Sequence, residues 1–162
     1  MNGSSTCDLT QRRAGGIETS DLPVPAPRPQ SKPKRSVRIL CIDDDAQVRE
    51  FMTQCLRFFQ HQVNVAPGGK RGLEMFRAAQ ENEPYELVIT DLGMPDLDGQ
   101  RVAQAIKAES PETPVIMMTG WGTFMDESEE AVPVDAVVGK PPRMKELNDL
   151  VLRMAAPAAA SL

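Results

Sequence analysis

The chain has 162 residues, enough for one domain of ordinary size plus a tail, and 41% hydrophobic residues, enough for a single buried core. Its charged fraction of 25% is that of an average globular protein, and no apolar stretch approaches the ~20 residues of a membrane helix, which excludes membrane insertion. Residues 1–36 carry six basic and three acidic side chains, whereas the remainder carries twelve basic and twenty acidic ones, and such an acidic body argues against nucleic acid as the ligand.

Residues 1–36 contain five prolines and no aromatic residue. Such a segment buries too little apolar surface to offset the entropy lost on ordering, so we predict a disordered, Pro-rich basic arm. Its cluster of Lys32, Lys34 and Arg35 is interpreted as part of a solvated linker, with contact to an acidic partner or a membrane surface as the alternative. The folded domain is expected over residues 37–154, followed by a frayed tail over residues 155–162.

Short apolar runs and amphipathic segments alternate through the folded domain. Residues 37–42 are predicted to form a strand, and apolar side chains at three- and four-residue spacing predict a helix over 48–59. The further expected elements, in chain order, are a strand at 62–65, a helix at 73–79, a strand at 85–90, a helix at 102–106, a strand at 114–118, a poorly patterned helix at 125–131, a strand at 136–139 and a helix at 147–154. Because the strands are continuous apolar runs, we expect burial on both faces. The fold class is therefore α/β, a doubly wound five-stranded parallel sheet with helices on both faces.

The cysteines and the histidine carry little chemistry. Cys7, Cys41 and Cys55 are too few and too scattered for a disulfide framework, and Cys41 and Cys55 are predicted to be small core residues. No C-x-x-C pair exists and His61 is the only histidine, which argues against a zinc site. His61 is expected to be a polar residue in a helix-to-strand loop, and a reducing cytoplasm fits best.

Polar residues stand where the predicted strands end. Asp43 and Asp44 follow the first strand, Asp91 the third, Thr119 the fourth and Lys140 the fifth. In a parallel α/β sheet these positions share one edge, where ligands bind. Close carboxylates repel each other until a cation relieves them, and an all-oxygen ligand set selects Mg²⁺. With a lysine and a hydroxyl beside it, the site is suited to phosphoryl transfer to an aspartate.

Four segments at these positions resemble the receiver (CheY-like) domain of bacterial response regulators, in the family's order and spacing. They are R-I-L-C-I-D-D-D at 38–45, L-V-I-T-D-L-G-M-P-D-L-D-G at 87–99, V-I-M-M-T-G at 115–120 and G-K-P at 139–141. The resemblance covers about residues 37–154 and implies the flavodoxin-like receiver fold.

The resemblance also implies roles for these residues in a two-component phosphorelay. Asp91 would be the phosphoacceptor. Mg²⁺ would be held by Asp44, Asp91 and the main-chain carbonyl of Gly93, with Asp43 acting through water.

On the phosphoryl side of the site, the resemblance implies that Thr119 binds a phosphoryl oxygen and responds to it, while Lys140 pairs with the group. Lys140 and Pro141 would be joined by a cis peptide bond. The phosphoryl group would come from the phosphohistidine of a histidine kinase or a histidine phosphotransfer protein. Such a domain phosphorylates itself, with an intrinsic autophosphatase activity, and is not a turnover enzyme.

The remaining acidic residues have structural interpretations. Asp45 is predicted to cap the first helix. Asp96 and Asp98 belong to a tight turn in which Gly99 supplies backbone freedom. An EF-hand is excluded because its ligand positions would include residues that cannot chelate. A phosphatase of the haloacid-dehalogenase type would want a second acid where Gly93 stands.

The chain departs from the family pattern near the predicted switch. Val137 stands where many receivers have a switch aromatic, and Pro142 replaces a large apolar residue. Trp121 lies two residues after Thr119, and our hypothesis is that it gates or reports phosphorylation in place of the missing aromatic. Tryptophan fluorescence with Mg²⁺ and beryllofluoride tests this hypothesis, and an unchanged signal from folded protein would count against it.

Met154 is followed by eight residues, so the expectation is a receiver without an output domain that signals by conformational change and protein contact. Two alternatives stay open. One is the receiver segment of a hybrid histidine kinase, and the other is a pseudo-receiver, a binding module that is never phosphorylated.

Overall fold

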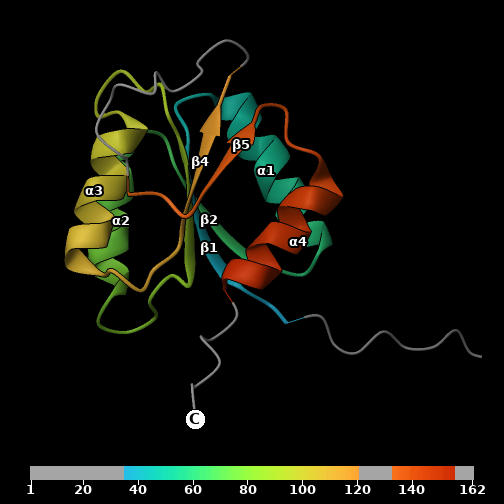
Figure 1. Ribbon diagram of the computed structural model, residues 1–162, viewed down its shortest axis with the longest axis horizontal. Helices are drawn as coiled ribbons and strands as arrows, with labels where there is room; N and C mark the ends of the chain where they lie inside the picture. The colour runs from blue at the N-terminus through green and yellow to red at the C-terminus, as the bar shows by residue number, and fades with distance from the viewer. Residues whose placement is uncertain (1–34, 121–132, 156–162) are drawn as a thin grey trace, which may run out of the picture. The chain divides into compact units, whose positions relative to one another are not determined.

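The computed structural model describes residues 35–120 and 133–155 of the chain (Figure 1). Most of the predicted arm and tail, Trp121 and the predicted helix at 125–131 lie outside the described residues. Within them, the elements in chain order are β1 (Arg38–Ile42), α1 (Ala46–Phe58), β2 (Gln62–Ala66), α2 (Gly69–Ala79), β3 (Leu87–Asp91), α3 (Gly99–Glu109), β4 (Val115–Thr119), β5 (Ala136–Gly139) and α4 (Met144–Met154).

The five strands form one parallel sheet in the order β2-β1-β3-β4-β5. In its register, Ile39 of β1 stands between Val63 of β2 and Leu87 of β3. Since all strands point the same way, their carboxyl ends meet at one edge of the sheet. The predicted doubly wound α/β fold is confirmed.

Helices cover both faces of the sheet, with α1 and α4 on one side and α2 and α3 on the other (Figure 1). Alternate residues of β1 serve the two cores, because successive side chains of a strand point to opposite faces. Ile39 and Cys41 pack with Leu56 of α1 and Val151 of α4. The second core contains alternate β1 residues and side chains of the opposite helices, among them Leu40, Ile42, Phe76, Val102 and Ile106.

The prediction of burial on both faces holds for the middle of the sheet and is wrong for its two outer strands. All residues of β3 and β4 are buried, whereas β2 and β5 mix buried or half-buried positions with exposed ones. Val137 on β5 is 47% exposed. Within the described residues, β2 and β5 each have a neighbouring strand on one side only. They therefore lie at the margins of the sheet, where the helices packed on its faces cover them less.

His61 lies between α1 and β2 as predicted, and it is buried, with 4% of its surface exposed. Its Nδ1 accepts a hydrogen bond from the Val37 backbone N–H at 3.2 Å, and its Nε2 lies 3.0 Å from the Asn148 Oδ1 on α4. These bonds satisfy both ring nitrogens of the buried imidazole.

Cys41 and Cys55 are both buried, as expected of small core residues. Burial, and then the charge of Asp43, raise the pKa of the Cys41 thiol to about 12, so its thiol stays protonated. None of the helices in the described ranges combines the length and apolar character needed to cross a membrane.

Candidate functional site

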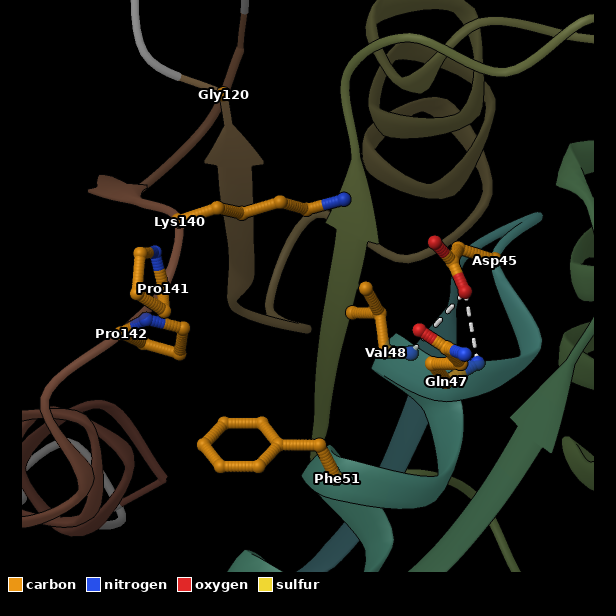
Figure 2. Close-up of a pocket in the computed structure, with 8 residues that line it drawn as sticks. All are labelled: Asp45, Gln47, Val48, Phe51, Gly120, Lys140, Pro141 and Pro142. Atoms are coloured by element: carbon orange, nitrogen blue, oxygen red, sulfur yellow. Dashed lines mark hydrogen bonds between the residues drawn. The ribbon is translucent and has the colours of Figure 1, made fainter.

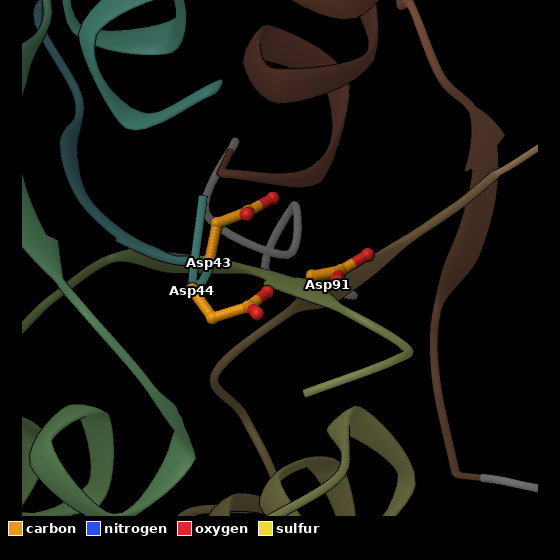
Figure 3. Close-up of side chains that lie close together, drawn as sticks. All are labelled: Asp43, Asp44 and Asp91. Carbon is orange, nitrogen blue, oxygen red and sulfur yellow. The ribbon is translucent and has the colours of Figure 1, made fainter. Parts of the chain in front are cut away.

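Three aspartates meet at the carboxyl edge of the sheet (Figure 3). Asp43 and Asp44 directly follow β1, and Asp91 is the last residue of β3. Each offers one carboxylate oxygen, and these three oxygens lie within 4.8 Å of one another. Asp43 and Asp91 are buried, with 2% and 7% of their surface exposed, while Asp44 faces solvent. The structure therefore brings together the acidic residues singled out from the strand ends.

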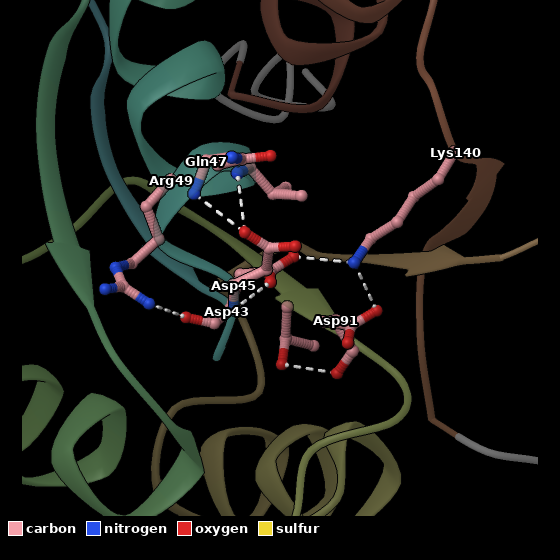
Figure 4. Close-up of polar contacts among 8 residues, drawn as sticks. Asp43, Asp45, Gln47, Arg49, Asp91 and Lys140 are labelled. Atoms are coloured by element: carbon pink, nitrogen blue, oxygen red, sulfur yellow. Dashed lines mark hydrogen bonds and ion pairs between the residues drawn. The ribbon is translucent and has the colours of Figure 1, made fainter.

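The turn from β1 into α1 is shaped by side chain to backbone hydrogen bonds (Figure 4). Asp45 Oδ1 accepts from the N–H groups of Gln47 at 2.7 Å and Val48 at 3.4 Å, which confirms the predicted helix cap. Asp43 Oδ1 accepts from the Asp45 N–H at 2.9 Å, and the Arg49 Nη1 donates to the Asp43 carbonyl oxygen at 2.8 Å. These bonds fix the direction in which Asp43 and its neighbour Asp44 leave the strand.

Lys140 reaches into the acidic cluster from the end of β5 (Figure 4). Its Nζ lies 2.7 Å from Asp43 Oδ2 and 2.8 Å from Asp91 Oδ1. Burial acts to lower the pKa of the Lys140 ammonium, but the hydrogen bonds and charges of Asp43 and Asp91 outweigh it and raise that pKa above its ordinary value. The ammonium therefore stays charged between the two carboxylates.

Asp91 is held in an environment that disfavours its charge. Burial raises its pKa most, Lys140 acts to lower it, and the charges of Asp43 and Asp44 raise it further, so that the net shift is upward. The Lys140 ammonium thus offsets the negative charge of the cluster only in part. A site of this kind gains from a bound cation.

The donor set fits Mg²⁺. Each group offered by Asp43, Asp44 and Asp91 is a carboxylate oxygen, and such hard ligands suit Mg²⁺ better than a thiophilic metal. Gly93 lies on the exposed loop after β3, with open space beside its Cα. The role of its carbonyl as a metal ligand stays a prediction.

Thr119 is the last residue of β4 and is buried, and its carbonyl oxygen accepts a hydrogen bond from the Lys140 N–H at 2.8 Å. This backbone bond holds Thr119 and Lys140 side by side at the ends of the neighbouring strands β4 and β5. The peptide bond between Lys140 and Pro141 is cis. Pro142, which departs from the family pattern, is buried.

Gly99 is required at the start of α3 for a different reason than we predicted. Its φ does not lie in the left-handed region, so the expectation that it supplies backbone freedom is wrong. A Cβ on Gly99 would instead lie 2.1 Å from the Asp91 carbonyl oxygen. Only glycine lets α3 begin this close to the end of β3. Asp98 caps the helix by accepting from the Arg101 N–H at 2.8 Å.

Two features of the site were not predicted from the sequence. Asp96 accepts hydrogen bonds from the first residues of α2 as well as from its own loop, and the signal for this was an N-terminus of α2 that offers only Gly68 as its capping residue. The second is a groove of about 460 Å³ beside Lys140 (Figure 2). Its lining is mainly apolar and includes Val48, Phe51, Pro141 and Pro142. No spacing in the sequence relates α1 to the residues after β5.

Residues 39–152 match the family model described as the response regulator receiver domain. The match spans well over half of the 162 residues, so the chain belongs to the response regulator receiver family of two-component signalling. It carries the acidic pocket of Asp43, Asp44 and Asp91 together with Lys140.

Among curated proteins, the chain is similar to the probable transcriptional regulator ycf27 of Galdieria sulphuraria, with 34% identity over 116 residues, which cover 71% of this chain and 44% of the relative. It is also similar to the response regulator receiver protein CpdR of Brucella abortus, with 27% identity over 118 residues, which cover 72% of this chain and 95% of the relative. The chain spans less than half the length of several of the curated relatives that it matches.

Among solved structures, the chain is similar to the response regulator protein TrrA of Thermotoga maritima in complex with Mg²⁺ and BeF. The TM-score is 0.63 and the identity 26%, with 73% of this chain and 98% of the other covered. A receiver domain protein of Clostridium thermocellum also has a TM-score of 0.63 and 26% identity, with 74% and 93% covered.

Proposed function

We propose that this domain, extending over residues 37–154, is a phosphoacceptor whose Asp91 takes a phosphoryl group from a phosphohistidine in a Mg²⁺-dependent reaction. The donor is a histidine kinase or a histidine phosphotransfer protein. The observation that carries the proposal is the position of Asp91, a buried carboxylate with Asp43 and Asp44 on one side and Lys140 in direct contact.

In this reaction a carboxylate oxygen of Asp91 attacks the phosphorus atom, the phosphorus–nitrogen bond to the donor histidine breaks, and its electron pair stays on the imidazole. An acyl phosphate on Asp91 results.

The other residues position the group and balance its charge. Asp44, Asp91 and the carbonyl of Gly93 would hold Mg²⁺, with Asp43 acting through water, and the bound ion would supply positive charge to the phosphoryl oxygens. Lys140, which contacts Asp91 Oδ1, would pair with a phosphoryl oxygen attached there. The Thr119 hydroxyl is assigned the hydrogen bond to another phosphoryl oxygen, which would couple phosphorylation to a change at the ends of β4 and β5.

The phosphorylated domain then acts by conformational change and protein contact, with loss of the phosphoryl group through its own autophosphatase activity. Trp121, which lies outside the described residues, remains our candidate for the gate. The receiver segment of a hybrid histidine kinase is the alternative setting for the same chemistry. A pseudo-receiver is disfavoured, because a domain that only binds needs neither the acidic cluster nor Lys140.

Incubation of the chain with acetyl phosphate and Mg²⁺, followed by intact mass measurement, tests the proposal. We expect one phosphoryl group on the wild type and none on Asp91→Ala. Asp149→Ala, which removes an exposed aspartate on α4, is the matched control and is expected to be phosphorylated like the wild type. A folded wild type that takes up no phosphoryl group from acetyl phosphate or any phosphohistidine donor would refute the proposal.

A further inference from the structure

Asp96, on the loop after β3, joins that loop to a different element. Its Oδ1 accepts from the Gly69 N–H at 3.1 Å and from the Leu97 N–H at 2.8 Å, and its Oδ2 accepts from the Lys70 N–H at 3.0 Å. Gly69 and Lys70 are the first two residues of α2. One oxygen, Oδ1, therefore bridges the loop and the helix.

This bridge satisfies helix groups that α2 cannot satisfy itself. Its N-cap residue is Gly68, which has no side chain to accept a hydrogen bond. Partial burial acts to raise the pKa of the Asp96 carboxyl, but the hydrogen bonds from Lys70, Leu97 and Gly69 together outweigh it and hold that pKa below its ordinary value. The contact is also close, because a Cβ on Gly69 would lie 2.4 Å from the Leu97 carbonyl oxygen.

The loop held in this way leads straight from the phosphoacceptor. At its start, the Leu92 N–H donates to the Met118 carbonyl of β4 at 2.9 Å, and at its end the Gly99 N–H donates to the Leu92 carbonyl at 2.9 Å. These bonds fix the two ends of the loop against the sheet and α3. Asp96 fixes its middle, three residues after Gly93, against α2, which lies beside α3 on the same face of the sheet (Figure 1).

We propose that Asp96 is a positioning residue for the metal site. It acts through the loop, by holding the segment that carries the Gly93 carbonyl against the N-terminus of α2. The inference rests on the proposed function of Asp91 and its neighbours, and it adds a residue that touches neither the metal nor the phosphoryl group. Residues that orient the metal ligands without touching the metal affect metal affinity, whereas a residue that only caps a helix affects the stability of the fold.

The test is a titration of the full chain with Mg²⁺, in which the Kd is obtained from the NMR amide shifts of the residues around Asp44 and Asp91. Thermal unfolding is measured separately without metal. We expect Asp96→Ala to raise the Kd for Mg²⁺ about tenfold, the lower end of the effect of a residue behind the ligands. Asp96→Asn should raise the Kd less than Asp96→Ala does, because its Oδ1 can still accept from Gly69 and Leu97 while its amide nitrogen cannot accept from the Lys70 N–H.

The matched control is Glu109→Gln, which weakens a carboxylate contact between the C-terminal ends of α3 and α2, away from Asp96. Glu109 Oε1 lies 2.9 Å from Arg77 Nε and Oε2 lies 3.0 Å from it. This variant should leave the Kd for Mg²⁺ unchanged. An unchanged Kd in folded Asp96→Ala would overturn the inference and leave Asp96 as a helix cap.

A second measurement needs no variant. In the wild type, saturating Mg²⁺ should shift the amide signals of Gly69 and Lys70, because their N–H groups bond to the loop that carries Gly93. Unmoved signals would contradict the inference. If the wild type showed no Mg²⁺-dependent shifts near Asp44 and Asp91, the proposed function itself would fail, which is a different outcome.

Discussion

At the scale of single residues, Asp91 is under opposing demands. Its carboxylate has to be buried beside Asp43 and Asp44 to share a cation with them, and that burial opposes its ionisation. Lys140 supplies a direct counter-charge, at 2.8 Å, yet the net effect still raises the Asp91 pKa. In the metal-free site, burial of the ionised Asp91 therefore acts against the stability of the fold.

This balance predicts a stabilising substitution. A carboxyl whose pKa is higher in the folded than in the unfolded state adds stability below its unfolded value, about 3.9, and that stability is lost as the pH rises through the folded value. At pH 7 the ionised Asp91 therefore destabilises the metal-free fold. We expect Asp91→Asn to have a higher midpoint of urea unfolding than the wild type at pH 7. The difference between the two midpoints should be smaller at pH 3. A lower midpoint than the wild type at pH 7 would contradict the assigned direction.

Gly99 and Gly93 make a matched pair for a second prediction. A Cβ at Gly99 would lie 2.1 Å from the Asp91 carbonyl oxygen, a backbone atom that cannot rotate away, whereas one at Gly93 would meet open space. Gly99→Ala should therefore lower the free energy of unfolding by about 2 kcal/mol, as overpacking does, and Gly93→Ala should lower it much less. Urea unfolding of both variants checks the difference, and equal effects would show that the approach at Gly99 can relax.

At the scale of elements, the helices begin where side chains replace missing backbone partners. Asp45 caps α1 and Asp98 caps α3 from their own N-termini, while α2 takes its cap from Asp96 on a distant loop. The first two caps could be predicted or recognised locally. The third could not, because a residue 27 positions away reaches α2 only once the sheet has brought the loop to it.

The cap on α1 gives a prediction at this scale. Asp45→Ala removes the acceptor for Gln47 and Val48 and should lower the free energy of unfolding by about 1 kcal/mol, while Asp45→Asn should lower it by less, since asparagine is an equally good N-cap. Chemical denaturation measures both variants. An equal loss in Asp45→Asn and Asp45→Ala would mean that the charge of Asp45, not its hydrogen bonds, stabilises the turn.

The positions of the strand ends were well predicted from the sequence, because the carboxyl ends of parallel strands lie at the same edge of a sheet. Apolar runs that end in Asp43, Asp91 or Thr119 have to end at one edge once the strands are parallel. The exposure of β2 and β5 was not predictable from the same runs, since it depends on which strands lie outermost. The burial of His61 likewise depends on Asn148, a partner 87 residues further along the chain.

At the scale of the whole molecule, part of the negative charge of the folded domain is concentrated at one site. Three carboxylates gather at the sheet edge, where a bound cation would link the ends of β1 and β3. Binding to the folded state alone stabilises it, by about 2.7 kcal/mol at a ligand concentration of 100 times the Kd. Binding of the metal at this site should therefore be measurable as an increase in the free energy of unfolding of the domain.

We accordingly expect Mg²⁺ to raise the Tm of the wild type and to leave that of Asp44→Ala nearly unchanged. Differential scanning calorimetry at rising Mg²⁺ concentrations measures this, with Na⁺ at matched ionic strength as the control for screening. A Tm that rises equally in the wild type and in Asp44→Ala would place the binding of Mg²⁺ elsewhere on the molecule.

The central claim, that Asp91 and no other carboxylate of the cluster accepts the phosphoryl group, is tested most directly by locating the acyl phosphate. The chain phosphorylated in the presence of Mg²⁺ is reduced with borohydride, which converts an aspartyl phosphate to homoserine, and the peptides are then sequenced by mass spectrometry. We predict homoserine at position 91. Homoserine at position 43 or 44 with none at 91, or no reducible acyl phosphate in phosphorylated protein, would contradict the account.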